Sequence, residues 1–228
     1  MNRITKDPEE RKQEIIETAQ ALFLKKGYEK TLVSDIVKAM GVAQGTFYYY
    51  FESKDNVLEA ITINMVEELR ERVLAIAQDD SLEPIEKWKR AITASSDYKI
   101  ARRKEVFEIL QASKVLDNHR MRERYRKLSR ERVSQLFVDI LNEGIADGVF
   151  QTDFPEETAR IAITIGKSVS DDLKDILLRP EAYEDPAAAA RQKFQAVQAA
   201  MERVLAAPEG SLAIISDEML QDWFGKDS

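Results

Sequence analysis

The sequence predicts an all-α protein of about nine or ten helices, and three observations carry this prediction. Apolar residues recur at spacings of three and four along most of the chain, which is the period of one face of an α-helix. Strand signals are absent, since no hairpin dipeptide lies between alternating apolar and polar runs. Pro, Gly, Asp and Ser separate the periodic stretches at positions typical of helix ends.

The first helix is expected to begin after Asp7 and to end at Gly27. Asp7 is a good N-cap, and Pro8 fits the first turn because its missing N–H would have no helical partner there. The inner face of this helix carries a stripe of apolar residues, namely Ile15, Ala19, Leu22 and Phe23. This helix should brace the two that follow.

Residues 31–54 predict two short helices joined by a tight turn at Gly41. Glycine tolerates the left-handed backbone that ends a helix sharply, and Thr31 is a plausible N-cap for the first of the two. Apolar residues lie four apart on both sides of the glycine, at Ile36, Met40, Phe47 and Phe51. If these point inward, the pattern is that of a helix-turn-helix.

The residues of this motif that are expected to face outward have side chains suited to DNA. Gln44 can bond the edge of an adenine, and Thr46 can meet a phosphate or a thymine methyl. Gly45 lets the backbone approach closely, and the hydroxyls of Tyr48 and Tyr49 are good phosphate donors. Lys54 lies just beyond, where a cation and a helix N-terminus could both face a phosphate. The alternative is a plain helical hairpin with its aromatic residues in the core.

Longer helices are expected after residue 52. The first is capped by Ser53 and continues to about residue 77. It is long and begins at the helix-turn-helix, so it is a candidate for transmitting movement between that motif and the rest of the chain. Further helices are predicted over residues 81–98, 104–116, 118–146, 155–178 and 185–205, followed by an apolar C-terminal piece over 211–224. That last piece is too apolar for a disordered tail, and the sequence assigns it no function.

The two helices over 155–178 and 185–205 form a hairpin, and two copies of it would make a four-helix bundle. Gly166 and Ser170 are small and would let another helix approach closely. In such a bundle the dimer interface would consist of Ile161, Ile165, Val169, Leu173, Phe194, Val197 and Met201. The alternative is that both helices merely cover their own core.

Composition excludes several classes of site. The chain of 228 residues has no cysteine and one histidine, His119, so disulfides, thiolate metal sites and histidine-based triads are not expected. No apolar run is long enough for a bilayer and the first residues lack a signal-peptide core, which favours a cytoplasmic protein. The net charge is −7, yet residues 1–54 hold nine Lys and Arg against eight Asp and Glu, a net +1, leaving −8 for the remainder.

A basic run over residues 120–132 stands out within this acidic remainder. Met121, Tyr125 and Leu128 are interleaved at helical spacing, so the segment is amphipathic. The run is either a solvated face that pairs with acidic residues elsewhere or an attraction for an anionic ligand or partner.

The N-terminal residues also carry a resemblance. GVAQGTFYYYFESKDNVLEAI resembles the recognition segment of the TetR family of transcriptional regulators, SDIVKAMGV its preceding helix, and QEIIETAQALFLKKGYEKTLV its first helix. The resemblance covers about the first 65 residues. It implies a helix-turn-helix domain over 1–52 and an effector-binding and dimerisation domain over 53–228. It places the contacts with double-stranded DNA on Thr31, Ser34, Gln44, Gly45, Thr46, Tyr48, Tyr49 and Lys54.

By the same resemblance, the protein is expected to be a repressor that binds a near-palindromic operator as a homodimer and that a small-molecule effector releases. An apolar or amphipathic effector would lie among the helices from about 81 to 150 and shift the helix over 53–77. Candidate pocket residues are Trp88, Ile92, Phe107, Leu110, Gln111, Met121, Tyr125 and Phe137.

Two other classes of function are a helical protein-binding adaptor and a bundle enzyme. The sequence has no nucleophile–base arrangement, no Gly-rich phosphate loop and no helical Glu-x-x-His motif, so neither catalysis nor a cofactor or metal is expected.

Overall fold

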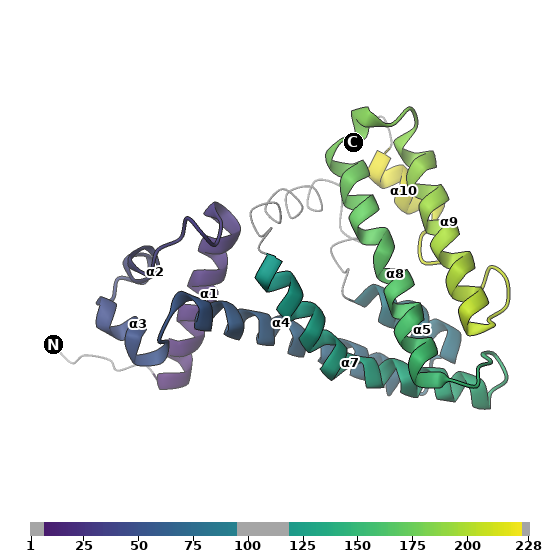
Figure 1. Ribbon diagram of the computed structural model, residues 1–228, viewed down its shortest axis with the longest axis horizontal. Helices are drawn as coiled ribbons and strands as arrows, with labels where there is room; N and C mark the ends of the chain where they lie inside the picture. Colours follow the sequence, from purple (N-terminus) through teal and green to yellow (C-terminus); the bar gives the residue numbers. More distant parts are fainter. Residues whose placement is uncertain (1–6, 95–118, 225–228) are drawn as a thin grey trace. The chain divides into compact units, whose positions relative to one another are not determined.

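The computed structural model describes residues 7–94 and 119–224, and within these ranges the regular structure is helical, without a strand. Figure 1 shows the helices in chain order. They are α1 (Pro8–Lys26), α2 (Val33–Met40), α3 (Gln44–Tyr50), α4 (Lys54–Ala77), α5 (Pro84–Thr93), α7 (His119–Ala146), α8 (Pro155–Leu178), a 3-10 turn (Pro180–Ala182), α9 (Pro186–Leu205) and α10 (Asp217–Phe224). In this described part, no helix is both long enough and apolar enough to span a membrane.

The chain divides into two compact units. Of the described residues, 7–67 and 119–128 belong to the first unit, and 68–94 and 129–224 belong to the second. The boundary predicted between residues 52 and 53 therefore falls inside the first unit. The reason is that Val57, Leu58 and Ile61 at the start of α4 are buried in the same core as α1–α3.

The core of the first unit is built from the apolar stripes that the sequence predicted. Phe47 of α3 is completely buried, and so are Ile15 and Ile36 of the helices before it. Burying each such side chain contributes about 1.5–3 kcal/mol. The same cluster includes Ala19, Phe23, Val37, Phe51 and Leu58.

Three helices begin where capping chemistry predicts. The Asp7 side chain accepts from the N–H of Glu9 at 2.8 Å, Ser53 Oγ accepts from the N–H of Asn56 at 3.2 Å, and Asp185 accepts from the N–H of Ala188 at 2.9 Å. These contacts confirm the predicted starts of α1, α4 and α9, because each satisfies an N–H that the first turn leaves free.

One helix start was predicted wrongly. The helix expected from residue 81 begins at Pro84, since proline suits the first helical position and Ser81 is held in a turn before it. Both the N–H and the hydroxyl of Ser81 donate to Asp79 Oδ1, at 3.0 and 2.5 Å. The helix predicted over 104–116 lies outside the described residues.

In the second unit, α8 and α9 form the predicted hairpin, and α10 packs against it (Figure 1). Their shared core contains Val169, Leu173, Ile176, Leu177, Ala190, Phe194 and Leu220. The expected close approach at Gly166 is confirmed, because a Cβ there would lie 2.7 Å from Ile92 Cγ1 and 3.3 Å from Met201 Sδ. Helix α5 thus comes close to α8 at this glycine.

This core corrects the predicted dimer interface. Val169, Leu173, Phe194 and Met201 are buried within the unit itself, so the prediction was wrong for these four residues. A step of four residues turns a helix by about 40° more than one full turn. The stripe that starts at the exposed Ile161 therefore rotates, over three such steps, from the outer face of α8 onto the inner face at Leu173.

Candidate nucleic-acid interface

The turn between α2 and α3 is set by Gly41. Its backbone is left-handed, with φ 67° and ψ 30°, as predicted. Its N–H donates to the carbonyl of Lys38, and the N–H of Val42 donates to that of Val37 at 3.0 Å, which satisfies carbonyls that the helix end leaves free. A Cβ at Gly41 would meet no described atom within 4 Å, so backbone conformation rather than space requires glycine here.

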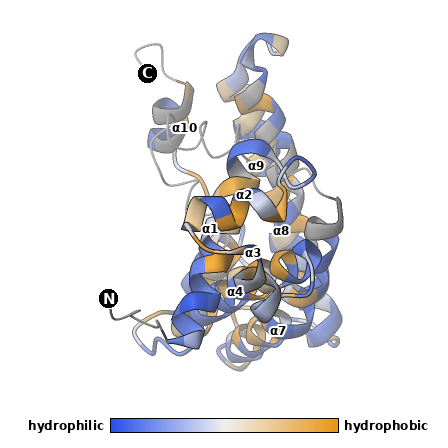
Figure 2. Cartoon of the chain, turned by 90° about the vertical axis from the view of Figure 1, so that its left-hand side faces the viewer, coloured by the Kyte–Doolittle hydropathy of each residue, from blue (hydrophilic) through white to orange (hydrophobic). Residues whose placement is uncertain are grey.

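Helix α3, called the reading helix below, separates its apolar and polar side chains. Phe47 is completely buried, whereas Tyr48 is 52% exposed and Tyr49 is 79% exposed. Gln44 and Gly45 are exposed as well, and Thr46 is half-buried. In Figure 2 the helix is drawn largely in the pale tints of intermediate hydropathy that tyrosine and threonine produce. The outward placement expected from the sequence is thus confirmed, while the DNA contacts stay a prediction.

Helix α2 carries one predicted DNA contact, Ser34, which is exposed. Leu32 precedes it and is 61% exposed, although its N–H is held by Asp35 Oδ2 at 2.8 Å. The sequence did not indicate an exposed position for Leu32, because an apolar residue next to a helix start is usually buried. Its position at the start of α2, beside an outward serine, was the signal available.

Thr31 was predicted wrongly as a DNA contact. Its side chain is completely buried, and its hydroxyl donates to the carbonyl of Gly27 at 2.7 Å. Nor does it cap α2, because the N-cap position is Leu32. The hydroxyl instead closes the end of α1.

Lys54 is used within the protein. Its ammonium donates to the carbonyls of Tyr28 and Thr31, at 2.7 and 2.9 Å, and lies 4.1 Å from the centre of the Tyr28 ring. The Tyr28 hydroxyl donates to Asp55 Oδ1 at 2.6 Å. This group of contacts, the Tyr28–Lys54 cluster, fastens the first turn of α4 to the turn between α1 and α2. An ammonium has three donors, so one is left for a phosphate.

Electrostatics also stabilise the start of α2. Asp35 forms an ion pair with Lys26 at 2.5 Å. Hydrogen bonding from Lys26, helped by the N–H of Leu32, lowers the pKa of Asp35 from its ordinary value. The carboxylate therefore keeps its charge, and its position in the first turn of α2 favours a negative group.

The predicted effector pocket is brought together only in part. Trp88 of α5 is completely buried and packs edge-to-face on Phe137 of α7 at 5.3 Å and on Phe150 at 6.1 Å. Ile92 lies against Gly166. Because Trp88 has no accessible surface, a ligand reaches it only if neighbouring side chains move. Phe150 was missed, since the sequence places it in a loop.

The remaining pocket candidates are distributed differently. Tyr125 is half-buried and belongs to the first unit, whereas Trp88, Ile92 and Phe137 belong to the second. Phe107, Leu110, Gln111 and the side chain of Met121 lie outside what the structure describes.

The basic run of α7 begins in the first unit. Arg124 Nη1 lies 3.5 Å from Glu59 Oε2 of α4, and an open depression beside this pair is lined by Asp55, Leu58, Glu123, Arg124 and Lys127. The lining combines two acidic and two basic residues, which agrees with the interpretation of the run as a solvated face that pairs with nearby acids.

Comparison with known proteins agrees with this geometry. Residues 15–61, which run from within α1 through α2 and α3 to the start of α4, match the model of "Bacterial regulatory proteins, tetR family". The transcriptional repressor KstR2 of Mycolicibacterium smegmatis is 29% identical over 146 residues, 64% of this chain and 70% of the relative. Residues 15–61 therefore form a TetR-family domain.

Solved structures show that the TetR fold extends beyond the matched residues. A TetR/AcrR regulator from Thermobifida fusca superposes with a TM-score of 0.55 at 24% identity, covering 82% of this chain and 96% of the other. SmeT, solved in complex with triclosan, gives a TM-score of 0.61 at 17% identity and covers 88% and 93% of the two chains. At these identities the likeness concerns the fold.

Proposed function

We propose that this TetR-family chain is a transcriptional repressor that binds an operator in double-stranded DNA and that a small molecule releases. The observation that carries the proposal is the exposure of Tyr48 and Tyr49 on a reading helix whose Phe47 is completely buried. The proposed contacts are Ser34, Gln44, Gly45, Thr46, Tyr48, Tyr49 and the remaining donor of Lys54. Hydroxyl and ammonium donors position the protein on phosphates, and Gln44 reads a base edge.

A homodimer is part of the proposal. One helix-turn-helix reads too few base pairs to specify a site, whereas a two-fold dimer presents two reading helices about 34 Å apart. The operator should then be a near-palindrome with half-sites about one DNA turn apart. Operator binding and regulation of genes place such a protein in the cytoplasm.

An apolar or amphipathic effector completes the proposal. Relatives named KstR2 are transcriptional repressors, and SmeT was solved with triclosan. In this chain, the aromatic cluster of Trp88, Phe137 and Phe150 offers apolar contacts within the second unit. An effector would lower operator affinity only by the difference between its affinities for the DNA-competent and DNA-incompetent states.

The proposed function is tested by fluorescence anisotropy with DNA from the region upstream of the protein's own gene. We expect saturable binding to a near-palindromic segment and weaker binding by the Tyr49→Phe variant, whose fold should be unchanged because the side chain is 79% exposed. Equal binding to scrambled DNA, or equal affinity in the variant, would move the contact surface away from α3.

A further inference from the structure

Leu32 does little to stabilise the protein in which it lies. It is the N-cap of α2, a position where Ser, Thr, Asp and Asn are preferred because their side chains accept from N–H groups of the first turn, and leucine makes no such bond. Leu32 is also 61% exposed, so burial contributes little. A residue that serves its own fold neither by capping nor by packing is a candidate for contact with a partner.

The other exposed apolar side chains of the first unit indicate which partner. Among the described residues of this unit, the large apolar side chains that are exposed are Leu32, Tyr48 and Tyr49. All three lie in the helix-turn-helix, whereas α1 adds none among its described residues. Single exposed leucines are common on protein surfaces, so the position of Leu32 decides the argument. It belongs to the motif that is proposed to bind DNA.

The backbone of Leu32 is already engaged, so its side chain is what it offers to DNA. Its N–H donates to Asp35 Oδ2 at 2.8 Å and is therefore not available to a phosphate. Lys26 forms an ion pair with the same Asp35 oxygen at 2.5 Å. The charge of Asp35 is thus balanced within the protein, which limits its repulsion of a phosphate near Leu32.

The ammonium of Lys54 lies beside Leu32. It donates to the carbonyl of Thr31 at 2.9 Å, and that carbonyl belongs to the peptide group that joins Thr31 to Leu32. Because this peptide group is trans, its carbonyl oxygen lies on the same side of the C–N bond as the Cα of Leu32. The donor that Lys54 keeps for a phosphate is therefore next to an exposed apolar side chain.

We propose that Leu32 packs on the deoxyribose next to the phosphate that Lys54 binds. In a helix-turn-helix the first helix crosses the DNA backbone, where every phosphate is joined to a sugar with an apolar C2′ methylene. The inference rests on the proposed function and adds a selection for deoxyribose over ribose. A 2′-hydroxyl set against leucine would lose hydrogen bonds to water without gaining others.

The first test is the Leu32→Ser variant, in which stability and operator affinity should change in opposite directions. Serine supplies the missing cap and should raise the melting temperature by about 2–4 °C. Loss of the apolar contact should weaken operator binding about 5–30-fold. A residue with a purely structural role would not weaken binding while stabilising the fold. Circular dichroism and fluorescence anisotropy give the two quantities.

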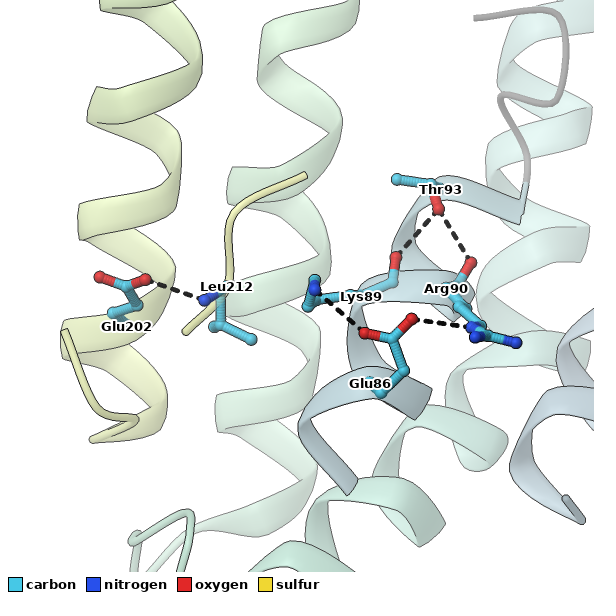
Figure 3. Close-up of polar contacts among 6 residues, drawn as sticks. All are labelled: Glu86, Lys89, Arg90, Thr93, Glu202 and Leu212. Carbon is cyan, nitrogen blue, oxygen red and sulfur yellow. Dashed lines mark hydrogen bonds and ion pairs between the residues drawn. The ribbon is translucent and has the colours of Figure 1, made fainter. Parts of the chain in front are cut away.

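Helix α5 of the second unit supplies a matched control. Its N-cap, Glu83, has an extended backbone and no side-chain capping bond, as Leu32 has in α2. Figure 3 shows Glu86 in the first turn of α5, where it accepts from Lys89 at 3.0 Å and from Arg90 at 2.8 Å. Glu83→Asp keeps the charge and adds a cap, so it should raise the melting temperature similarly and leave operator affinity unchanged.

The second test varies the DNA by replacing one deoxyribonucleotide of the operator at a time with a ribonucleotide. The unmodified protein should lose about 5-fold or more in affinity at one nucleotide of each half-site. This loss should disappear in Leu32→Ser, because a serine hydroxyl beside the sugar bonds to the 2′-hydroxyl. Losses that come from altered DNA geometry should be equal in the two proteins.

The outcomes separate the inference from the proposed function. Operator affinity in Leu32→Ser equal to that of the unmodified protein would refute the sugar contact and leave the proposed function standing. A Leu32-dependent loss on replacing thymine by deoxyuridine, without a ribose effect, would also overturn it, because the partner would then be a thymine methyl. If neither the unmodified protein nor Glu83→Asp binds a near-palindromic segment, the proposed function fails and the inference with it.

Discussion

At the scale of single residues, Gly41 and Gly45 lie four positions apart and serve different purposes. Gly41 has a φ of 67°, in the left-handed region, whereas Gly45 is a helical residue of the reading helix with an exposed position. A Cβ on either would meet no described atom within 4 Å. The two alanine variants therefore separate backbone strain from access to DNA.

Gly41→Ala should lower the free energy of unfolding by about 1–2 kcal/mol, because a Cβ strains the left-handed backbone. Gly45→Ala should raise it by about 0.5–1 kcal/mol through helix propensity and yet weaken operator binding, since the new methyl group lies on the reading face. Urea unfolding and fluorescence anisotropy give the two quantities. Improved operator affinity in Gly45→Ala would show that the backbone does not approach DNA there.

Variants of Lys54 and Tyr49 separate an effect on stability from an effect on operator binding. Lys54→Met removes charged hydrogen bonds to the carbonyls of Tyr28 and Thr31 and should reduce stability by about 1–3 kcal/mol, with weaker operator binding as a consequence. Tyr49→Phe should leave the melting temperature unchanged and reduce operator affinity by about 3–10-fold, the value of one neutral hydrogen bond. An unchanged melting temperature for Lys54→Met would mean that the Tyr28–Lys54 cluster does not hold α4.

At the scale of elements, the end of α9 depends on a buried carboxylate. Glu202 is 6% exposed and accepts from Gln198 Nε2 at 2.8 Å as well as from Leu212. Burial by itself raises the pKa of Glu202, but the N–H groups of Leu212 and Gly210 and the Gln198 amide outweigh burial, and the pKa lies below its ordinary value. The charged form is therefore the one that holds the C-terminal segment.

This shift predicts an acid-dependent loss of stability. A pKa lowered on folding means that the unfolded chain binds the proton more tightly than the folded chain. The stabilisation by the Glu202 carboxylate is therefore complete above the ordinary pKa of 4.5 and is lost as the pH falls through the lower folded value. The free energy of unfolding should fall below about pH 4.5 more steeply in the unmodified protein than in Glu202→Gln. Parallel pH profiles would exclude Glu202 as a contributor.

Local capping chemistry explains how well the elements could be predicted. Asp7, Ser53 and Asp185 act on N–H groups within three residues, so the sequence contains the whole interaction. Thr31 shows the limit: its hydroxyl bonds to Gly27 at the end of the preceding helix, and no local pattern distinguishes this from a cap. The prediction of interface residues on α8 was wrong in part because positions four residues apart rotate gradually around this 24-residue helix. Which of them are buried depends on where α9 and α10 pack.

At the scale of the whole molecule, charge is unevenly distributed along the chain. Residues 1–54 carry a net +1 within a total of −7. Phosphate contacts release counterions, so the logarithm of operator affinity should fall linearly with the logarithm of salt concentration, although the protein as a whole is acidic. Anisotropy titrations at several salt concentrations measure the slope, and a flat response would exclude phosphate contacts.

The continuity of α4 across the two units has a practical consequence for exchanging operator specificity between relatives. Val57, Leu58 and Ile61 are buried with α1–α3, although they lie in the helix that continues to Ala77. A hybrid regulator joined at residue 52 would combine α1–α3 of a relative with Val57, Leu58 and Ile61 of this chain, so the core of the first unit would contain mismatched side chains. Splicing after Glu67 would carry the complete core with the head, and the two hybrids should differ in solubility before any promoter is assayed.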